Sequence, residues 1–128
     1  MKRRQLSGEI EKFQGYGRKL GYPTANIRCD TLQKDGVYFG YADLGEFRSH
    51  PALIFVGTPT TVGDVVRRVE AHLLDIPDKD YYGKILHLDL DYFHRKNETF
   101  ETIAELKEAM HDDEKQARAW FKSQTFYS

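Results

Sequence analysis

The sequence predicts an all-β protein that ends in one α-helix, and two observations support this prediction. The first is a series of short apolar or alternating segments, separated by turn residues, over most of the chain. The second is a change to helical spacing of the apolar residues after Thr99. Short strands with no helices between them are typical of an antiparallel barrel or sandwich. The length of 128 residues fits a single domain, 1–128.

The first predicted strands lie in three segments. Residues 6–10 alternate between small or apolar and polar side chains. Residues 36–42 are rich in aromatic and β-branched side chains and are bounded by turn residues. Residues 51–56 are a continuous apolar run, which is consistent with a strand buried on both faces.

Two further segments alternate. In residues 68–74 the apolar side chains share one face, whereas Glu70 and His72 share the other. A turn at 77–80 separates this segment from residues 84–93, which alternate again. The face of the second segment that we expect to be apolar carries Leu86, Leu88, Leu90 and Tyr92.

The C-terminal part has the features of a helix. Thr102 and Glu105 fit a capping box, in which the two side chains satisfy free N–H groups of the first turn. Whether the helix breaks near Asp112–Asp113 is left open by the pattern. We expect the apolar stripe to pack against the barrel, with Met110 and Trp120 as core or barrel-capping residues. The apolar residues at helical spacing are Ile103, Leu106, Met110, Ala117, Trp120 and Phe121.

Composition excludes several classes of protein. The formal net charge of −1 argues against a nucleic-acid partner, because such proteins usually carry a basic excess. Cys29 is the single cysteine, which excludes an intrachain disulfide and makes a reducing, cytoplasmic location the expected one. No apolar run reaches the roughly 18 residues of a membrane span, so we expect no membrane partner. We expect a monomer.

The segment 15–26 combines features of a phosphate site. Its three glycines allow the backbone to approach a ligand closely, and Arg18 and Lys19 supply positive charge for phosphate oxygens. Thr24 and Asn26 offer oxygen ligands that suit Mg²⁺. The segment is not a Walker A loop, because no Gly-Lys-Ser/Thr follows the glycines. An ordinary loop is the alternative.

Glu70 is the candidate catalytic carboxylate, because it lies in the middle of a predicted strand on the polar face. The alternative is a solvated acid paired with Arg67 or Arg68. For His72 on the same face we expect a cross-strand hydrogen bond rather than a ligand. The turn at residues 57–61 could hold a phosphate or a ribose, and a plain turn is equally consistent with its sequence.

Taken in order, these segments resemble the riboflavin kinase (flavokinase) family. Residues 17–26 read Gly-Arg-Lys-Leu-Gly-Tyr-Pro-Thr-Ala-Asn, similar to the Gly-Arg-x-Leu-Gly-aromatic-Pro-Thr-Ala-Asn signature of that family. Residues 35–38, 69–72 and 82–84 resemble its Gly-Val-Tyr strand start, its Glu-x-His strand and its Tyr-Gly-Lys turn. The resemblance runs from Leu6 to Arg118.

The resemblance implies a six-stranded antiparallel Greek-key barrel with the C-terminal helix packed against it. It also implies transfer of the γ-phosphoryl of ATP to the 5′-hydroxyl of riboflavin, giving FMN and ADP, with ATP as co-substrate and Mg²⁺ as the divalent cation. The chain has no room for the adenylyltransferase domain that bacterial members commonly carry. We therefore expect either a monofunctional kinase or an excised domain.

Site residues follow from the same resemblance. Glu70 is the expected general base, and Thr24 and Asn26 are the expected metal ligands. ATP and its phosphates are assigned to Gly15, Gly17, Arg18, Lys19, Gly21, Pro23 and Thr24. Flavin contacts are assigned to Arg95, Glu98, Thr99, Phe100 and Ile103, with Tyr38 lining the approach.

The sequence departs from the family pattern in two places. Residues 55–60 read Phe-Val-Gly-Thr-Pro-Thr, where the family has Asn-Ile-Gly-x-Arg/Asn-Pro-Thr, and residues 95–97 read Arg-Lys-Asn, where it has Arg-x-Glu. These departures leave a second hypothesis open, namely a flavin- or FMN-binding module of the same fold without turnover. A third is a barrel that binds single-stranded nucleic acid through aromatic side chains and basic loops, which the balanced charge disfavours.

Overall fold

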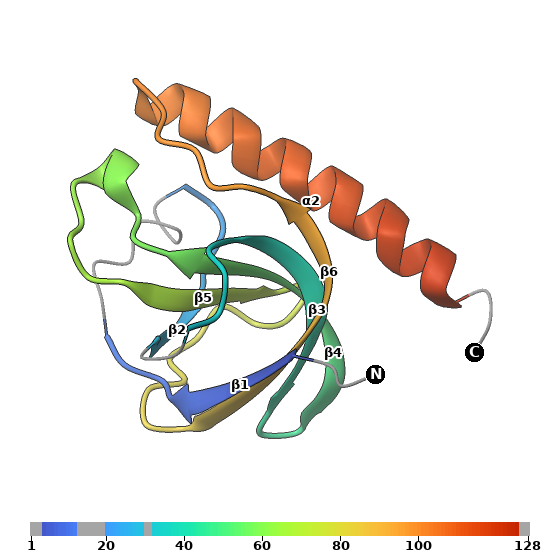
Figure 1. Ribbon diagram of the computed structural model, residues 1–128. Helices are drawn as coiled ribbons and strands as arrows, with labels where there is room; N and C mark the ends of the chain where they lie inside the picture. Colours follow the sequence, from blue (N-terminus) through green and yellow to red (C-terminus); the bar gives the residue numbers. More distant parts are fainter. Residues whose placement is uncertain (1–3, 13–19, 30–31, 126–128) are drawn as a thin grey trace.

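The computed structural model describes residues 4–12, 20–29 and 32–125, and shows one curled sheet with a long helix lying across it (Figure 1). The sheet has six antiparallel strands, so the predicted fold class is confirmed. The helix is α2 (Ile103–Thr125), and a short 3-10 helix, η1, covers Thr60–Val62. The strands are β1 (Arg4–Glu9), β2 (Ala25–Arg28), β3 (Gly36–Leu44), β4 (Phe47–Gly57), β5 (Arg68–Leu73) and β6 (Ile85–Arg95).

The hydrogen-bonded strand order is β1-β6-β3-β4-β5-β2, so the first two strands lie at the two edges of the sheet. These edges approach each other beyond the end of β1. There Glu11 bridges to Asn26 of β2, and its N–H donates to the Asn26 carbonyl at 2.8 Å. The barrel is therefore nearly closed. The strand β2 was not predicted from the residue pattern, because it has only four residues and follows directly on a Pro-Thr turn sequence.

The barrel interior is apolar. Leu86, Leu88 and Leu90 point inward, as predicted from the alternation of β6. Other buried residues of the interior come from β2 to β5 and include Ile27, Tyr38, Leu44, Ile54, Val56 and Val69. In β4 the alternate residue Leu53 is partly covered on the outer face, so both faces of the predicted apolar run are at least partly buried.

Tyr92 does not share the inward face of β6, and this part of the prediction is wrong. Gly40 pairs with Leu90 whereas Phe39 pairs with Tyr92, so β6 carries one extra residue at Asp91. Such a bulge reverses the alternation of the side chains beyond it. The Tyr92 ring consequently lies outside the barrel, 45% exposed, and stacks on Phe39 with ring centroids 5.6 Å apart.

The helix α2 is continuous. The capping box is confirmed, since the Glu105 N–H donates to Thr102 Oγ1 and the Thr102 N–H donates to Glu105 Oε1, both at 3.1 Å. No break occurs at Asp112–Asp113, and Asp113 is buried in an ion pair with Arg95 of β6.

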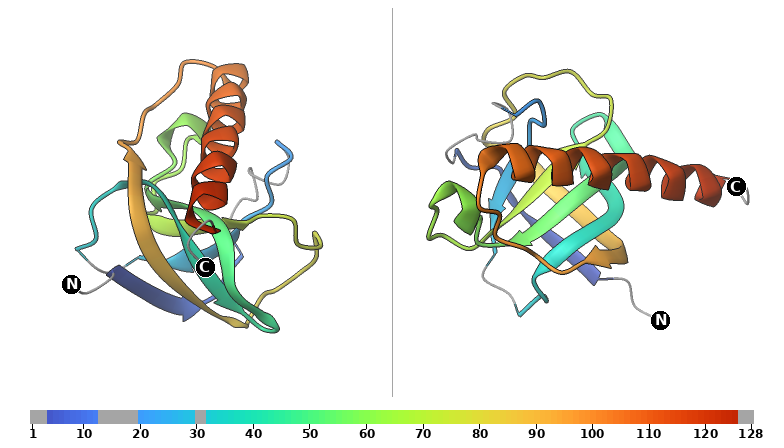
Figure 2. Two further views of the ribbon diagram at one scale, coloured as in Figure 1. Left: turned by 90° about the vertical axis from the view of Figure 1, so that its right-hand side faces the viewer. Right: turned by 90° about the horizontal axis from the view of Figure 1, so that it is seen from above.

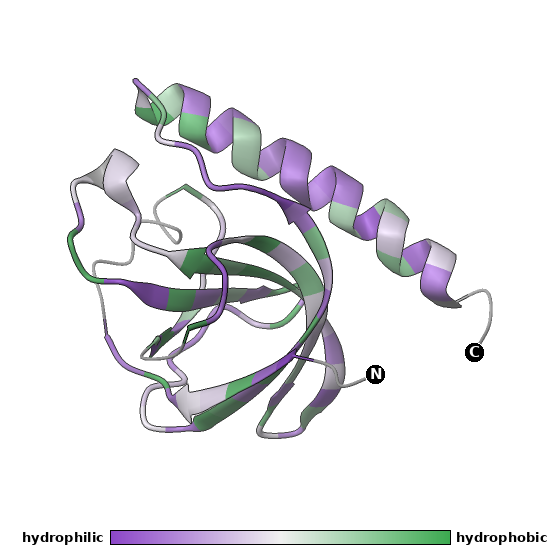
Figure 3. Cartoon of the chain, viewed as in Figure 1, coloured by the Kyte–Doolittle hydropathy of each residue, from purple (hydrophilic) through white to green (hydrophobic). Residues whose placement is uncertain are grey.

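The second half of α2 packs on the outer surface of the sheet, as the two views of Figure 2 show. Ala117 and Phe121 are buried there against Phe39 and Leu74, with Trp120 partly buried beside them. Hydrophilic residues alternate with hydrophobic ones along the helix, and hydrophobic residues also occur in its first half (Figure 3). The predicted packing of the helix on the barrel is confirmed. Among the described residues, no helix is both long and apolar enough to cross a membrane.

Candidate active site

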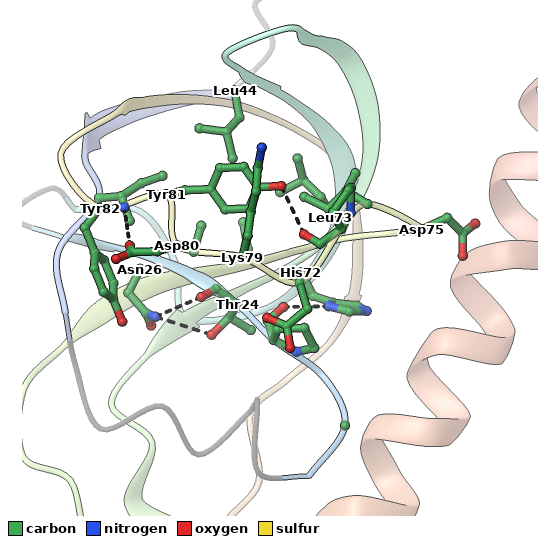
Figure 4. A pocket seen from close by; sticks show the side chains of 18 of the residues that line it. Thr24, Asn26, Leu44, His72, Leu73, Asp75, Lys79, Asp80, Tyr81 and Tyr82 are labelled. Atoms are coloured by element: carbon green, nitrogen blue, oxygen red, sulfur yellow. Dashed lines mark hydrogen bonds between the residues drawn. The ribbon is translucent and has the colours of Figure 1, made fainter.

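Two adjoining pockets open beside the strand pair β2–β5, and Thr24 and His72 line both of them. We call the first the loop pocket, because the 75–82 loop between β5 and β6 forms much of its wall (Figure 4). We call the second the helix pocket, because Leu106, Met110 and Asp113 of α2 cover it. A ligand in one pocket would therefore adjoin a ligand in the other at Thr24.

Glu70 lines the helix pocket next to this junction. The hydroxyl of Thr24 donates to Glu70 Oε1 at 3.3 Å, and Nε of Arg68 donates to Oε2 at 3.3 Å. The side chain is 15% exposed, so it is not the solvated acid of the alternative, although it does pair with Arg68. Burial raises the pKa of Glu70 above its usual value, and Arg68 and Thr24 offset only part of that rise. A carboxylate with a raised pKa is a stronger base.

Arg68 is itself buried and shared between two carboxylates. Its guanidinium donates to Asp64 at 2.5 Å as well as to Glu70. The side chains of Arg68 and Asp64 are only 3% and 8% exposed. Because Asp64 already balances the charge of Arg68, the guanidinium orients Glu70 without fully compensating its burial.

Asn26 lies opposite Glu70 in the β2–β5 register and lines the loop pocket. Its Nδ2 donates to the carbonyl and the hydroxyl oxygen of Thr24, both at 3.3 Å (Figure 4). Its Oδ1 is buried and has no hydrogen-bond partner among the described residues. An unpaired amide oxygen beside a hydroxyl suits a hard divalent cation such as Mg²⁺.

Few further metal ligands come from the protein. Within residues 4–12, 20–29 and 32–125, no group of three or more His, Cys, Asp or Glu side chains could hold a metal ion. Mg²⁺ commonly takes only one or two protein ligands and completes its octahedron with water and substrate phosphates. The donor set of Thr24 and Asn26 therefore fits Mg²⁺ bound together with a nucleotide.

His72 orients the segment that carries Thr24. Its Nδ1 lies 2.8 Å from the Pro23 carbonyl, which can only accept, so Nδ1 carries the proton. This is the hydrogen bond to the neighbouring segment that the sequence predicts for His72. The ring of Tyr22 packs edge-on against the imidazole, with centroids 5.6 Å apart.

The helix pocket is closed at one end by an ion pair between β6 and α2. Arg95 donates to both carboxylate oxygens of Asp113, at 2.9 and 2.7 Å, and His94 lies 3.2 Å from the same carboxylate. Arg95 and Asp113 also line the pocket. The pair therefore fixes the helix over the pocket and fixes the guanidinium in the pocket wall.

Replacing Asp113 by alanine should destabilise the protein by about 3 kcal/mol, because Arg95 and His94 then lose their partner in a mostly buried position. We expect a fall in melting temperature on the order of 10 °C, measured by thermal unfolding. The matched control is Asp112→Ala on the exposed side of the helix, where the carboxylate accepts a hydrogen bond from Gln116, and its effect should stay within about 0.5 kcal/mol. Equal effects of the two substitutions would refute this role of Asp113.

The 97–100 segment is held by the turn that follows β4. Asn97 Nδ2 donates to the Val56 carbonyl at 2.9 Å, and the Phe100 N–H donates to the hydroxyl of Thr61 at 2.9 Å. The hydroxyls of Thr60 and Thr99 lie 2.5 Å apart. The sequence was consistent with either a phosphate or ribose site or a plain turn at residues 57–61. In the structure this turn anchors the wall of the helix pocket.

The structure brings together only some of the residues expected to contact flavin. Arg95, Glu98 and Phe100 line the helix pocket. Thr99 and Ile103 are exposed and do not line it; the Thr99 hydroxyl is bonded to Thr60, and Ile103 is the first residue of α2.

Tyr38, which the resemblance assigns to the flavin approach, lines neither pocket. Its ring is 2% exposed in the barrel interior and packs against Phe93. Its hydroxyl donates to the Lys34 carbonyl at 2.6 Å. The alternation of β3 turns this side chain inward, and its hydroxyl is satisfied at the barrel end.

Of the expected phosphate-binding residues, Gly21, Pro23 and Thr24 line the loop pocket. Gly15, Gly17, Arg18 and Lys19 lie outside the described residues. Gly21 has φ +91°, a conformation that favours glycine, so the turn before Thr24 depends on it.

Sequence reasoning missed much of both pocket walls. The loop pocket includes Tyr81 and Arg118, and the helix pocket includes Tyr22, Phe55 and Met110. Met110 was expected in the core or capping the barrel, and the structure places it in the pocket wall. Its position on the apolar stripe of α2 gave the only signal, because the first half of that stripe faces the pocket rather than the sheet.

A nearly closed barrel carries two adjoining pockets, a polar one under loops and an apolar one under a helix, with room for two small molecules side by side. The family model for riboflavin kinase, Flavokinase, matches residues 1–121. The chain belongs to the riboflavin kinase family.

Two curated relatives and one solved structure illustrate the likeness. The trifunctional protein RibF/MnmA of Mycoplasmoides gallisepticum is 34% identical over 121 residues, covering 93% of this chain and 18% of that protein. The riboflavin kinase of Mus musculus is 29% identical over 118 residues, covering 87% and 76%. The crystal structure of riboflavin kinase from Trypanosoma brucei superposes with a TM-score of 0.68 at 22% identity, covering 92% of this chain and 79% of that one, which supports the fold. The chain thus spans less than a fifth of the first relative and about three quarters of the second.

Proposed function

We propose that this chain transfers the γ-phosphoryl of ATP to the 5′-hydroxyl of riboflavin, giving FMN and ADP. The observation that carries the proposal is the hydrogen bond between Thr24 and Glu70 at the junction of the two pockets. A candidate metal ligand and a candidate base thereby meet where two substrates would adjoin. Membership of the riboflavin kinase family supports the choice of substrates.

Each pocket suits one substrate. Leu53, Phe55, Phe100 and Met110 give the helix pocket apolar walls for a flat ring system. The loop pocket takes the nucleotide, with apolar side chains such as Leu44 and Tyr81 for the base. In this arrangement the phosphates lie toward Thr24 and Asn26, and the ribityl chain points toward Glu70.

Thr24 and Asn26 would hold the divalent cation through the hydroxyl and the unpaired amide oxygen. When bound, Mg²⁺ neutralises the negative charge on the phosphate oxygens during transfer. Asn26 also donates to Thr24, so it keeps the hydroxyl of Thr24 in place between the metal and Glu70.

Glu70 acts as the general base. Its carboxylate accepts the proton of the 5′-hydroxyl while that oxygen bonds to the γ-phosphorus, and the bond from the γ-phosphorus to the bridging oxygen of ADP breaks. Phosphoryl transfer depends mainly on the positioning of the two substrates and on charge neutralisation. The base therefore contributes a further rate increase beyond that from substrate alignment. Arg68 and Thr24 hold the two carboxylate oxygens in place.

The setting of the reaction follows from the composition. The single cysteine supports a protein of the reducing cytoplasm, and the balanced charge supports one without a nucleic-acid or membrane partner. A monomer is our working assumption, which light scattering of the purified chain tests.

Incubation with ATP, Mg²⁺ and riboflavin tests the proposal. We expect FMN and ADP to form in equal amounts, and chelation of the metal with EDTA to abolish the reaction. Chromatography separates FMN from riboflavin and ADP from ATP. Binding of riboflavin without formation of FMN would instead establish the flavin-binding module.

A further inference from the structure

Two buried side-chain oxygens lack a hydrogen-bond partner among the described residues, Asn26 Oδ1 and Asn97 Oδ1. Each belongs to a residue that lines one of the two pockets, Asn26 the loop pocket and Asn97 the helix pocket. Buried polar groups are paired in most native structures, so an unpaired one needs an explanation. The proposed metal would account for Asn26 Oδ1, and Asn97 Oδ1 requires a separate partner.

The orientation of the Asn97 amide is set by its neighbours. Its Nδ2 donates to the Val56 carbonyl at 2.9 Å. The opposite orientation would place the amide oxygen against that carbonyl oxygen, with no hydrogen between them. Gly57 makes this close approach possible, because a Cβ at that position would lie 2.4 Å from Asn97 Nδ2. The atom left without a partner is therefore Oδ1.

Two donors of the same segment have other partners. The guanidinium of Arg95 donates to Asp113 and to the Lys96 carbonyl. The Phe100 N–H donates to the hydroxyl of Thr61. Among the described residues none donates to Asn97 Oδ1, and a ligand in the helix pocket can supply the missing hydrogen.

We propose that Asn97 is a specificity-determining residue, whose Oδ1 accepts a hydrogen bond from a polar hydrogen of riboflavin. The proposal rests on the assignment of the helix pocket to the flavin. Oxidised riboflavin offers two kinds of donor, the N3–H of the ring and the hydroxyls of the ribityl chain. Either removes the cost of the unpaired oxygen when the flavin binds, and an analogue without that hydrogen leaves the oxygen unpaired.

The test compares riboflavin with N3-methylriboflavin and with the 2′-, 3′- and 4′-deoxy analogues of riboflavin, by titration of flavin fluorescence on the full chain. We expect the unmodified protein to bind one analogue on the order of ten-fold more weakly than riboflavin. Weaker binding of N3-methylriboflavin identifies the ring N3–H as the donor, and weaker binding of one deoxy analogue identifies the hydroxyl that this analogue lacks. If the unmodified protein binds all the analogues as tightly as riboflavin, the proposal is overturned, and no variant is needed for this result.

Variants then assign the preference to Asn97. Asn97→Leu, of similar size, should bind riboflavin and the discriminated analogue equally, whereas a steric clash would persist with leucine. Asn97→Ala gives the same comparison if the leucine variant does not fold. The matched control is Thr61→Val, which loosens the Phe100 anchor and should weaken all ligands while keeping the preference. A preference that survives in the Asn97 variants overturns the proposal. Because the readout is binding, this result is independent of whether FMN is formed, and a protein that binds no flavin refutes both proposals.

Discussion

Replacement of Glu70 by glutamine should lower kcat for FMN formation by about 10²–10⁴-fold, the usual contribution of a general base. Glutamine keeps the size of the side chain and can still accept from Thr24, but it cannot take the proton of the 5′-hydroxyl. Arg68 retains Asp64 as its partner, so we expect the fold to survive. The measurement is steady-state formation of FMN together with riboflavin affinity by fluorescence titration.

The split between turnover and binding decides this prediction. Riboflavin affinity should stay near that of the unmodified protein, because Glu70 contacts only the reacting hydroxyl. The control Glu9→Gln removes an exposed carboxylate of β1 outside both pockets and should leave kcat unchanged. If Glu70→Gln keeps full turnover, Glu70 is not the base.

Replacement of Asn26 by leucine should raise the Mg²⁺ concentration needed for half-maximal activity by at least about 10- to 100-fold. Substitution of residues that only hydrogen-bond to a metal ligand already has effects of that size, and Asn26 is proposed as a ligand itself. The substitution removes the unpaired Oδ1 and leaves both pockets otherwise unchanged in size. The measurement is FMN formation as a function of Mg²⁺ at saturating ATP and riboflavin.

Stability distinguishes loss of a metal ligand from loss of the fold. The leucine substitution removes the buried Oδ1, which has no partner among the described residues. It also removes two hydrogen bonds of 3.3 Å that Nδ2 donates to Thr24, so the melting temperature should change little. The control Arg28→Gln alters an exposed residue of the same strand, paired with Glu11, and should leave the Mg²⁺ requirement unchanged. An unchanged Mg²⁺ requirement in Asn26→Leu would exclude Asn26 as a ligand.

Local sequence patterns predicted the strands with clear alternation. They did not predict a very short strand or a side-chain orientation that depends on strand pairing. The alternation of β5 correctly separated Glu70 from the core face. The strand β2 escaped notice because four residues are too few to show a period. The reversed orientation of Tyr92 depends on a bulge, which pairing with β3 creates and which leaves no trace in the spacing of β6.

The site was predictable in its polar centre but not in its walls. Thr24, Asn26 and Glu70 were identified by residue type and by resemblance, and the structure brings them together across β2 and β5. The resemblance does not give the face of β3 on which Tyr38 lies, and the structure turns this side chain into the barrel interior. Asp113, which the pattern treated as a candidate helix break, is instead the anchor of the helix, because a buried carboxylate is tolerated when a guanidinium pairs with it.

The central claim is that two substrates meet at Thr24 and Glu70. A crystal structure of the chain with Mg²⁺, riboflavin and a non-hydrolysable ATP analogue tests it most directly. The account predicts the γ-phosphate beside Thr24 and Asn26 at the inner end of the loop pocket, and the 5′-hydroxyl of riboflavin within hydrogen-bonding distance of Glu70. A complex in which the flavin lies outside the helix pocket, or in which Glu70 is remote from the 5′-hydroxyl, would contradict the account.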